Sequence, residues 1–393
     1  MLPSSGTLPS SGTLPSSGTL PSSGMDAGPV LALLDEAVAI GVFPGATLSV
    51  GDAGTERLAH ACGTLARAPH APSATPVTLA TSYDCASLTK VLATTAVAMR
   101  LVEQGLLDVD APAHALLPEL AAPGHARILL RHLLEHSSGL PWWRPFHEQL
   151  TLGERLGAPS ARDALLRMCA ALPLDAAPGE RAVYSDPGFI LLGFALERAG
   201  GARLDELAAR LVFAPAGLTT ARFVDLDADP RTPRPTPVAP TELCPRRGLV
   251  TGEAHDENCH AAGGITGHAG LFATVADVAR LAVLFVRSHA GERVPGGFPA
   301  ELVRTFFAPR GVPDSTRRLG WDGVSAARSS AGELWSRAGV GHLGFTGTSL
   351  WLDPERGRWV CLLSNRVHPS RTDERIQQLR PRLHDAVSRA LGA

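Results

Sequence analysis

One lysine stands out in this sequence because every other lysine or arginine position is an arginine. The chain holds 36 lysine and arginine residues, and only Lys90, in the stretch DCASLTKVLATT, is a lysine. Arginine does not lose its proton in a protein, whereas a buried lysine can shift its pKa far enough to exchange one. Lys90 therefore indicates a site where a proton is held or transferred.

Ser87 lies three residues before Lys90. Capping residues and apolar spacing predict a helix from residue 84, on which this spacing places both side chains on one face, about 5–6 Å apart at Cβ. Ser87 would lie in the first turn, where the helix dipole favours a developing negative charge. A serine hydroxyl becomes a nucleophile when a neighbouring base takes its proton. The pair predicts covalent catalysis, although Ser-x-x-Lys alone also occurs by chance.

Two further segments carry residues suited to acid–base chemistry. Tyr184, one of two tyrosines, stands in YSDPG, and a phenol near an ammonium group has a lowered pKa and can act as a general base. His342 stands in GVGHLGF before a predicted hairpin, where glycines let a substrate backbone approach closely. Taken alone, each residue could equally be structural.

The elements that must position these residues are strands near both ends of the chain and helices between them. Residues 44–63 and 347–366 each predict two strands around a turn. Residues 225–245 are proline-rich and predict irregular backbone, and Thr274 is an expected N-cap. Further helices are expected within 127–143, where the helix ends in a Ser-Ser-Gly-Leu-Pro turn, and over 160–170, 188–212 (broken by Gly-Gly), 274–289 and 372–391. The expected fold class is α+β: one antiparallel sheet built from both termini, flanked by helices, with a mostly helical lobe inserted in the middle.

The first 24 residues repeat the motif LPSSGT up to Met25. Proline, serine and glycine at this density cannot build a core, so this segment is expected to be either a disordered tail or a wrongly assigned start. Residues 25–393 are expected to form one domain. The repeat lacks the features of a secretory signal, and no run of about 18 apolar residues predicts a spanning helix, so a cytoplasmic location is expected.

Composition and spacing exclude several other classes. A net charge of −2 gives no basic surface for nucleic acid. The six cysteines form no Cys-x-x-Cys pair, and the cluster GEAHDENCHAAGG (252–264) lacks the His-Glu-x-x-His spacing, so no metal is expected. No Gly-x-Ser-x-Gly elbow is present, and Lys90 is not in a Gly-Lys-Ser/Thr context, which excludes an α/β-hydrolase and a Walker-type ATPase.

In combination, Ser87-x-x-Lys90, Tyr184-Ser-Asp186 and His342-Leu-Gly344 resemble the three motifs of the serine β-lactamase and penicillin-binding-protein superfamily. The chain looks most like the class C branch, with its D,D-peptidases and family VIII carboxylesterases. RHLLEHSSGLP (131–141) and GGITGHAGLFATVADVARLA (263–282) also resemble that branch, and the resemblance spans roughly residues 30 to 390. It implies a β-lactamase/transpeptidase-like fold, no cofactor, and a small ester, amide or peptide as substrate.

The resemblance also implies roles for individual residues. Ser87 would be the acylated nucleophile, Lys90 would keep Ser87 and Tyr184 correctly protonated, and Tyr184 would be the base for acylation and deacylation. His342 would contact the substrate carboxylate or the tyrosine. The backbone N–H groups of Ser87 and Phe345 would form the oxyanion hole.

Two positions depart from the family pattern and shape the functional expectation. Asp186 replaces the usual Asn of the second motif, and Leu343 replaces the usual Thr of the third. Asp186, Gly344, Phe345 and His268 are candidates for substrate binding. The expected function is hydrolysis of an ester or amide, with peptidoglycan-derived and β-lactam-like compounds among the candidates. The alternative is a catalytically silent protein that binds muropeptides in the same cleft.

Overall fold

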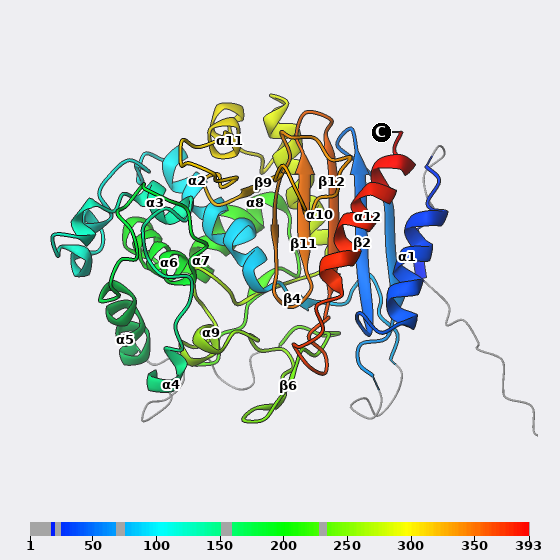
Figure 1. The fold of residues 1–393 in the computed structure, drawn as a ribbon, viewed down its shortest axis with the longest axis horizontal. Coiled ribbons are helices and arrows are strands. Elements are labelled where there is room, and N and C mark those ends of the chain that lie inside the picture. The colour runs from blue at the N-terminus through cyan, green and yellow to red at the C-terminus, as the bar shows by residue number, and fades with distance from the viewer. Residues whose placement is uncertain (1–16, 20–24, 68–74, 151–158, 228–233, 393) are drawn as a thin grey trace, which may run out of the picture.

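A seven-stranded antiparallel sheet joins the two ends of the chain (Figure 1). The computed structural model describes residues 17–19, 25–67, 75–150, 159–227 and 234–392. The strand order places C-terminal strands directly beside N-terminal ones: β1 (Ser17–Thr19), β3 (Thr55–Gly63), β2 (Gly45–Asp52), β12 (Arg358–Ser364), β11 (Ser349–Asp353), β10 (Val340–Leu343) and β9 (Asp322–Gly323). The expected sheet built from both termini is therefore confirmed, as are the two predicted hairpins.

Helices cover both faces of this sheet. On one face, α1 (Gly28–Ala39) and α12 (Ile376–Ala390) pack over Trp351 and Leu362, and on the other face α10 (Val275–His289) packs against β2 and β12 (Figure 1). Neighbouring residues of a strand point to opposite faces. Accordingly, Trp351 joins the core under α12, whereas its neighbours Leu350 and Leu352 join the larger core on the α10 side.

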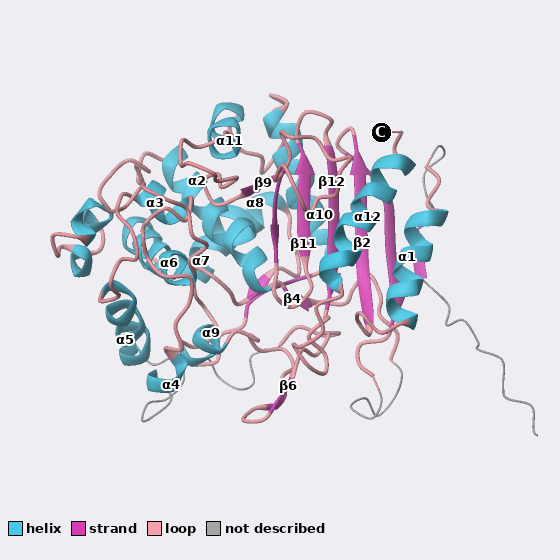
Figure 2. Cartoon of the chain, viewed as in Figure 1, coloured by secondary structure: helices cyan, strands magenta, loops and turns pink. Residues whose placement is uncertain are grey.

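A helical lobe lies beside the sheet, as the sequence predicts (Figure 2). Its longest helix is α6 (Asp186–Gly200), which ends at Gly201 in the left-handed conformation, φ +68°, as the Gly-Gly break predicts. The other helices outside the sheet layers are α2 (Ala96–Glu103), α3 (Leu130–Leu134), α4 (His147–Leu150), α5 (Pro159–Ala170), α7 (Leu204–Ala208), α8 (Ala214–Ala216), α9 (Glu257–Ala261) and α11 (Ala300–Phe307).

Short strands complete the molecule. The strands β4 (Tyr83–Asp84) and β5 (Arg222–Phe223) both pair with β8 (Leu271–Ala273) in a small second sheet. In the proline-rich segment, β6 (Leu243–Cys244) pairs with β7 (Gly248–Leu249), and residues 228–233 lie outside the described residues. Within the described residues, none of the helices has the length and apolar character needed to cross a membrane.

Three local expectations need correction. The helix expected from residue 84 begins instead as a 3₁₀ turn, Ala86–Leu88, and a π-helical stretch, Lys90–Thr95, before α2. The helix expected within 127–143 is only α3, because His136 and Gly139 have positive φ values of 60° and 83°. Thr274 occupies the N-cap of α10 without a side-chain capping bond, since its hydroxyl lies 3.0 Å from Thr220 Oγ1.

The N-terminal repeat also differs from expectation where it is described. Ser17–Thr19 pairs with residues 59–61 of β3 as the edge strand of the sheet. Strand pairing uses backbone hydrogen bonds and needs no apolar side chain, so composition alone did not predict it. The rest of the repeat, residues 1–16 and 20–24, lies outside the described residues.

Candidate active site

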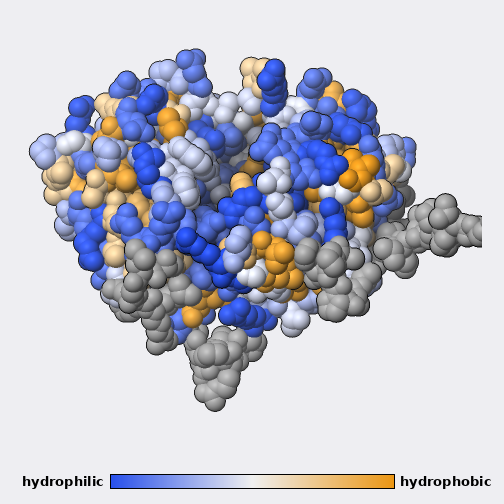
Figure 3. Space-filling model, turned by 60° about the horizontal axis from the view of Figure 1, so that its bottom comes forward, coloured by the Kyte–Doolittle hydropathy of each residue, from blue (hydrophilic) through white to orange (hydrophobic). Residues whose placement is uncertain are grey.

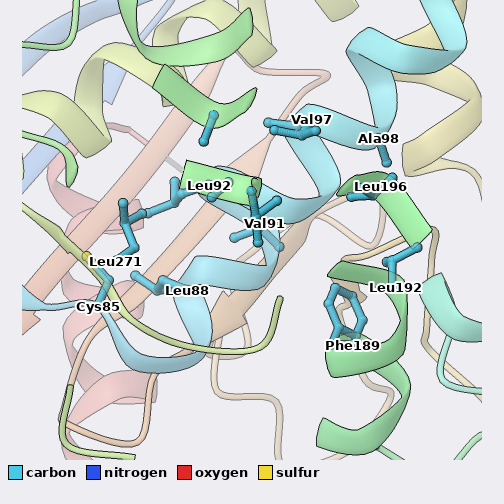
Figure 4. Close-up of a cluster of buried hydrophobic side chains, with 14 of the residues drawn as sticks. Cys85, Leu88, Val91, Leu92, Val97, Ala98, Phe189, Leu192, Leu196 and Leu271 are labelled. Carbon is cyan, nitrogen blue, oxygen red and sulfur yellow. The ribbon is translucent and has the colours of Figure 1, made fainter. Parts of the chain in front are cut away.

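The segment that carries Ser87 is held between the helical lobe and the sheet. Its apolar side chains Leu88, Val91 and Leu92 are buried, and Figure 4 shows them in one cluster with residues of α6. Just before Ser87, the Asp84 carboxylate accepts the N–H of Ala86 at 2.8 Å, and Ala86 has a φ of +46°. The carboxylate thus supports an unusual backbone conformation immediately before the serine.

Two side chains converge on the hydroxyl of Ser87. Lys90 Nζ lies 3.1 Å from Ser87 Oγ, and Tyr184 OH lies 2.8 Å from the same oxygen. Tyr184 is held there because the next residue, Ser185, caps α6 by accepting the N–H of Gly188 at 3.1 Å. Residues 87 and 184 are far apart in sequence, so the fold supplies the second contact.

The side chain of Lys90 is completely buried, and its nitrogen contacts three polar groups. Besides Ser87 it contacts Asp186 Oδ1 at 2.8 Å and the carbonyl oxygen of His268 at 2.9 Å. Burial favours the neutral amine, but the negative charge of Asp186 and the contact with Tyr184 outweigh it and raise the pKa of Lys90. Lys90 is therefore an ammonium group at neutral pH.

Tyr184 differs from the expectation of a lowered pKa. Burial and the charge of Asp186 raise its pKa, and the opposing effect of Lys90 is smaller. The sequence-based expectation took account of Lys90 but not of Asp186, whose negative charge offsets that of Lys90. At neutral pH, Tyr184 is therefore a phenol that donates its proton toward Ser87.

His342 lies on β10 at the border of the same space and is neutral. Its Nδ1 lies 2.8 Å from the carbonyl oxygen of Leu343, so Nδ1 carries the hydrogen. Burial, Lys90 and Arg317 hold the pKa of His342 well below its usual value. Its Nε2 is buried and has no partner among the described residues. His342 thus presents an acceptor nitrogen rather than a cation.

The turn after β10 is bonded to the segment that carries the serine. Thr346 Oγ1 donates to the carbonyl oxygen of Asp84 at 2.7 Å, and Thr348 Oγ1 donates to that of Cys85 at 3.0 Å. The backbone N–H of Phe345 makes no hydrogen bond to another group of the described chain, and Ser87 lies in the first turn of a helical segment, where backbone N–H groups lack an intrahelical partner. Two free amide donors at the site are the requirement for an oxyanion hole.

A cavity of about 620 Å³ opens over Ser87. Trp142, Trp143 and Phe345 supply aromatic walls, and the cavity continues past Phe345 to the start of α12. Figure 3 shows the hollow between helical lobe and sheet, with hydrophilic side chains across the middle of that face. This volume suits a small organic substrate.

Most residues singled out in the sequence meet here. Those that line the cavity are Ser87, Tyr184, Asp186, His342, Gly344 and Phe345, and Lys90 lies directly behind Ser87. His268 is different, because its buried ring bonds to Asp256 Oδ1 at 2.9 Å and Thr266 Oγ1 at 2.9 Å. It reaches the site through its carbonyl oxygen, which holds Lys90.

Sequence reasoning missed Asp84 and the threonines of the turn, because threonine and aspartate at these spacings match no motif. It also missed the four arginines of the cavity wall, Arg317, Arg366, Arg371 and Arg380.

Charged and polar side chains join the segment 252–264 to the rest of the chain. His255 Nε2 lies 3.0 Å from Glu242, and Arg371 Nη2 lies 2.6 Å from Glu257. His260 Nε2 and Glu253, 3.6 Å apart, both lie within the segment. Among the residues that the structure describes, no group of three or more His, Cys, Asp or Glu side chains is arranged to hold a metal ion. Ion pairs across the rim of the cavity account for this cluster.

Comparison with known proteins identifies relatives along most of the chain. A protein of Escherichia coli (strain K12) named "Putative D-alanyl-D-alanine carboxypeptidase" is 31% identical over 312 residues, which are 74% of this chain and 70% of that protein. The "N-acetylmuramyl-L-alanine amidase" of Bacillus subtilis (strain 168) is 30% identical over 309 residues, 73% of this chain and 68% of that protein.

Solved structures share the fold at lower identity. EstCE1, described as a hydrolase with promiscuous acyltransferase activity, superposes with a TM-score of 0.69 at 21% identity, covering 91% of this chain and 98% of that one. An octameric penicillin-binding-protein homologue from Pyrococcus abyssi gives 0.68 at 23% identity, covering 87% and 74%. The family model named Beta-lactamase matches residues 30–382. The chain therefore belongs to the beta-lactamase family of serine hydrolases.

Proposed function

We propose that this chain hydrolyses an ester or amide through an acyl-enzyme on Ser87. The observation that carries the proposal is the convergence of Lys90 Nζ and Tyr184 OH on one serine oxygen, at 3.1 and 2.8 Å, beneath an open cavity. A serine with a proton acceptor in hydrogen-bond reach, and a third group that orients the acceptor, is the arrangement of an activated nucleophile.

The proton steps follow from the charges at the site. The phenolate form of Tyr184, which the Lys90 ammonium stabilises, takes the proton of Ser87 as Ser87 Oγ attacks the carbonyl carbon, and Tyr184 thereby becomes the phenol. Tyr184 then gives this proton to the departing alcohol or amine. In the second half, Tyr184 takes a proton from water, hydroxide attacks the acyl-enzyme, and the proton returns to Ser87. Because the phenol form dominates at neutral pH, the rate is expected to rise toward alkaline pH.

The negative oxygen that develops in both halves would lie between the N–H groups of Ser87 and Phe345. Loss of one such donor typically costs about 100- to 1,000-fold in kcat. The threonines that bond the turn to residues 84 and 85 fix the separation of these two donors. The site therefore supports transition-state stabilisation as well as nucleophilic attack.

Two side chains at the site, His342 and Asp186, bear on the substrate class. His342 is neutral and offers an acceptor, so it supplies no cation for a carboxylate next to Ser87. Asp186 places a negative charge where the usual amide would contact a peptide or lactam group. Arg317 lines the same cavity, 5.4 Å from the centre of the Tyr184 ring, and is the nearest cation in the wall for a carboxylate. An uncharged ester or small amide needs no such cation and is the first substrate class to test. The names of the two sequence relatives make peptidoglycan fragments the second substrate class to test.

The deciding experiment is intact-mass spectrometry after incubation with a fluorophosphonate and, separately, with benzylpenicillin. Wild type should gain one phosphonyl group with loss of fluoride, and Ser87→Ala should gain nothing. An adduct with benzylpenicillin as well would widen the substrate class to lactams. Binding of muropeptides with no adduct from either probe would overturn the proposal in favour of a silent binding protein.

A further inference from the structure

Two buried arginines hold the backbone of the turn after β10. Arg380 Nη2, on α12, donates to the carbonyl oxygen of Gly344 at 3.2 Å and to that of Thr348 at 2.7 Å. Arg366 Nε, after β12, donates to the carbonyl oxygen of Phe345 at 2.8 Å. The carbonyl of Gly344 and the N–H of Phe345 belong to one peptide unit. Arg380 therefore bonds to the amide whose N–H the proposed oxyanion hole uses.

We propose that Arg380 is a positioning residue of the oxyanion hole, which it serves by holding and polarising the Gly344–Phe345 peptide. The inference rests on the proposed function, since it concerns the same oxyanion. It assigns a part in the reaction to α12, whose first turns border the cavity beyond Phe345.

Peptide geometry gives the first reason. A trans peptide unit is planar, with its C=O and N–H pointing in opposite directions. A guanidinium that fixes the oxygen of Gly344 on the α12 side therefore directs the N–H of Phe345 away from α12. The same nitrogen of Arg380 also holds Thr348 O, which accepts the N–H of Gly344 at 2.7 Å. Both ends of the turn are thus fixed by one side chain.

Charge gives the second reason. A hydrogen bond to the carbonyl of an amide polarises the whole group, so its N–H becomes a stronger donor. The donor here is an ion, which makes the effect larger than that of a neutral group. Such polarisation matters most when the acceptor is a negative oxygen, as it is in the transition state.

The surroundings of Arg380 leave its charge available to the turn. The side chain is 5% exposed, and among the described residues no carboxylate forms an ion pair with it. Its Nε is buried without a partner in this part of the chain. Burial and the nearby charge of Arg366 lower the pKa of Arg380 to about 9, so the guanidinium is still charged at neutral pH. A buried charge usually has a carboxylate partner, whereas this one faces carbonyl groups alone.

Arg366 has different hydrogen-bond partners and is a weaker candidate for the positioning residue. Besides Phe345 O it donates to the carbonyl oxygens of Arg371 and Asp373, both through Nη1 at 2.8 and 2.9 Å. It therefore also holds the chain that leads into α12. Its replacement would disturb that connection, so Arg380 is the residue to test.

The test compares Arg380→Met and Arg380→Lys with wild type on an aryl ester and on the matching thionoester. Sulfur accepts hydrogen bonds weakly, so the thionoester gains little from the oxyanion hole. Arg380→Met should lower kcat for the ester about 10- to 100-fold, with KM changed less than about twofold. The ester-to-thionoester ratio of kcat should fall by nearly the same factor. Arg380→Lys keeps the charge but not the planar guanidinium group. Its ester-to-thionoester ratio of kcat should lie between those of wild type and Arg380→Met.

Arg382→Met is the matched control, because Arg382 lies on the same helix and pairs with Glu36 at the surface. It should keep the wild-type ratio. If Arg380→Met does not fold, judged by thermal denaturation, Arg380→Lys decides. A parallel fall for ester and thionoester, or an unchanged kcat in a folded variant, would overturn the inference. Failure of wild type to form an adduct on Ser87 would instead reject the proposed function, so the two failures are distinguishable.

Discussion

Two buried cations lie on opposite sides of the candidate active site, and they have different partners. Lys90 contacts a carboxylate, Asp186 Oδ1, at 2.8 Å, together with the hydroxyl of Ser87. Arg380 contacts carbonyl oxygens alone, those of Gly344 and Thr348. The lysine is neutralised by its partner, and the arginine is not.

This difference separates two tasks. A lysine with three donors beside a hydroxyl and a phenol can stabilise whichever of them loses its proton, and its own charge can change. An arginine keeps its charge and binds through a rigid planar group, which suits a fixed position. In the proposed mechanism, Lys90 and Tyr184 thus move protons, and the sheet edge with α12 holds one of the two donors that receive negative charge, the N–H of Phe345.

The strongest way to break this comparison is to exchange one cation for the other type. Lys90→Arg keeps a positive charge but removes the compact ammonium group from a fully buried position. We expect the acylation rate to fall at least about 1,000-fold, as it does when members of other catalytic groups are removed. Stopped-flow measurement with an activated ester would give this rate. Arg382→Lys, the reverse change at an exposed site, should be silent, and near-normal turnover by Lys90→Arg would refute the mechanism.

The next largest effect is expected on the opposite side of the cleft, at Gly344. A Cβ atom there would overlap Thr348 Oγ1 and would lie 2.6 Å from the carbonyl oxygen of Cys85. Gly344→Ala must therefore push the turn away from the serine segment, and we expect kcat to fall about 100-fold, near the cost of one oxyanion donor. Steady-state kinetics should show the loss in kcat rather than KM. Gly311→Ala, where no atom lies within 4 Å of the added Cβ, is the control and should match wild type.

These two sides of the cleft also differ in how far the sequence predicts them. Ser87 and Lys90 are three residues apart, and any helical backbone brings such a pair together. Their contact is therefore present although the backbone there is 3₁₀ and π-helical rather than α-helical. Tyr184 was singled out because tyrosine is rare in this chain. Arg380 and Gly344 are 36 residues apart, on a helix and a turn that meet only in the folded molecule.

The fold shows the same limit. The hairpin strands are five or more residues long and have turn residues between them, which a sequence pattern can reveal. The strands β4 and β9 have two residues each, too few for any period, and they form because tertiary neighbours supply partners. The sequence pattern could not predict protonation either, since the neutral state of His342 depends on burial and on the charges of Lys90 and Arg317, which only the fold brings close to it.

The comparison can be sharpened by removing the carboxylate beside Lys90, which leaves this lysine, like Arg380, without a negatively charged partner. Asp186→Asn leaves an oxygen near Lys90 without the negative charge that raises the pKa values of Lys90 and Tyr184. Both values should fall, so the alkaline limb of the acylation rate should move to lower pH, and the rate at neutral pH should rise. A pH–rate profile measures this shift. An unchanged profile would show that Asp186 does not control these protons, and Asp163→Asn, at an exposed site, is the control.

The same variant has a defined effect on stability. The pKa of Lys90 is raised in the folded protein, so its stabilisation is complete below the ordinary lysine value of 10.5 and is lost as pH rises through the folded value. Asp186→Asn should therefore lower the free energy of unfolding at neutral pH, by about 1–3 kcal/mol, since the amide still accepts a hydrogen bond. The difference from wild type should shrink at strongly alkaline pH. Urea denaturation at neutral and at strongly alkaline pH measures this difference in unfolding free energy. A difference that grew with pH would contradict the prediction.

The smallest effect is expected where the two sides are joined. Thr346 Oγ1 donates to the carbonyl oxygen of Asp84 at 2.7 Å, and the side chain is 1% exposed. Thr346→Val keeps the shape but leaves that carbonyl without this partner, which should cost about 1–2 kcal/mol of unfolding free energy. Because Thr348 still bonds to Cys85 O, kcat should fall only about threefold, a size that corresponds to less than 1 kcal/mol.

Thr346→Ser, which retains the hydroxyl, is the control for this last change. It should recover kcat while remaining slightly less stable, because the lost methyl group leaves a small gap in a buried position. If instead Thr346→Val lowered kcat as much as Gly344→Ala, the hydroxyl of Thr346 would be the main connection between the two donors of the oxyanion hole. The guanidinium of Arg380 would then be the lesser support, and the separation of tasks between lobe and sheet edge would rest on a single threonine.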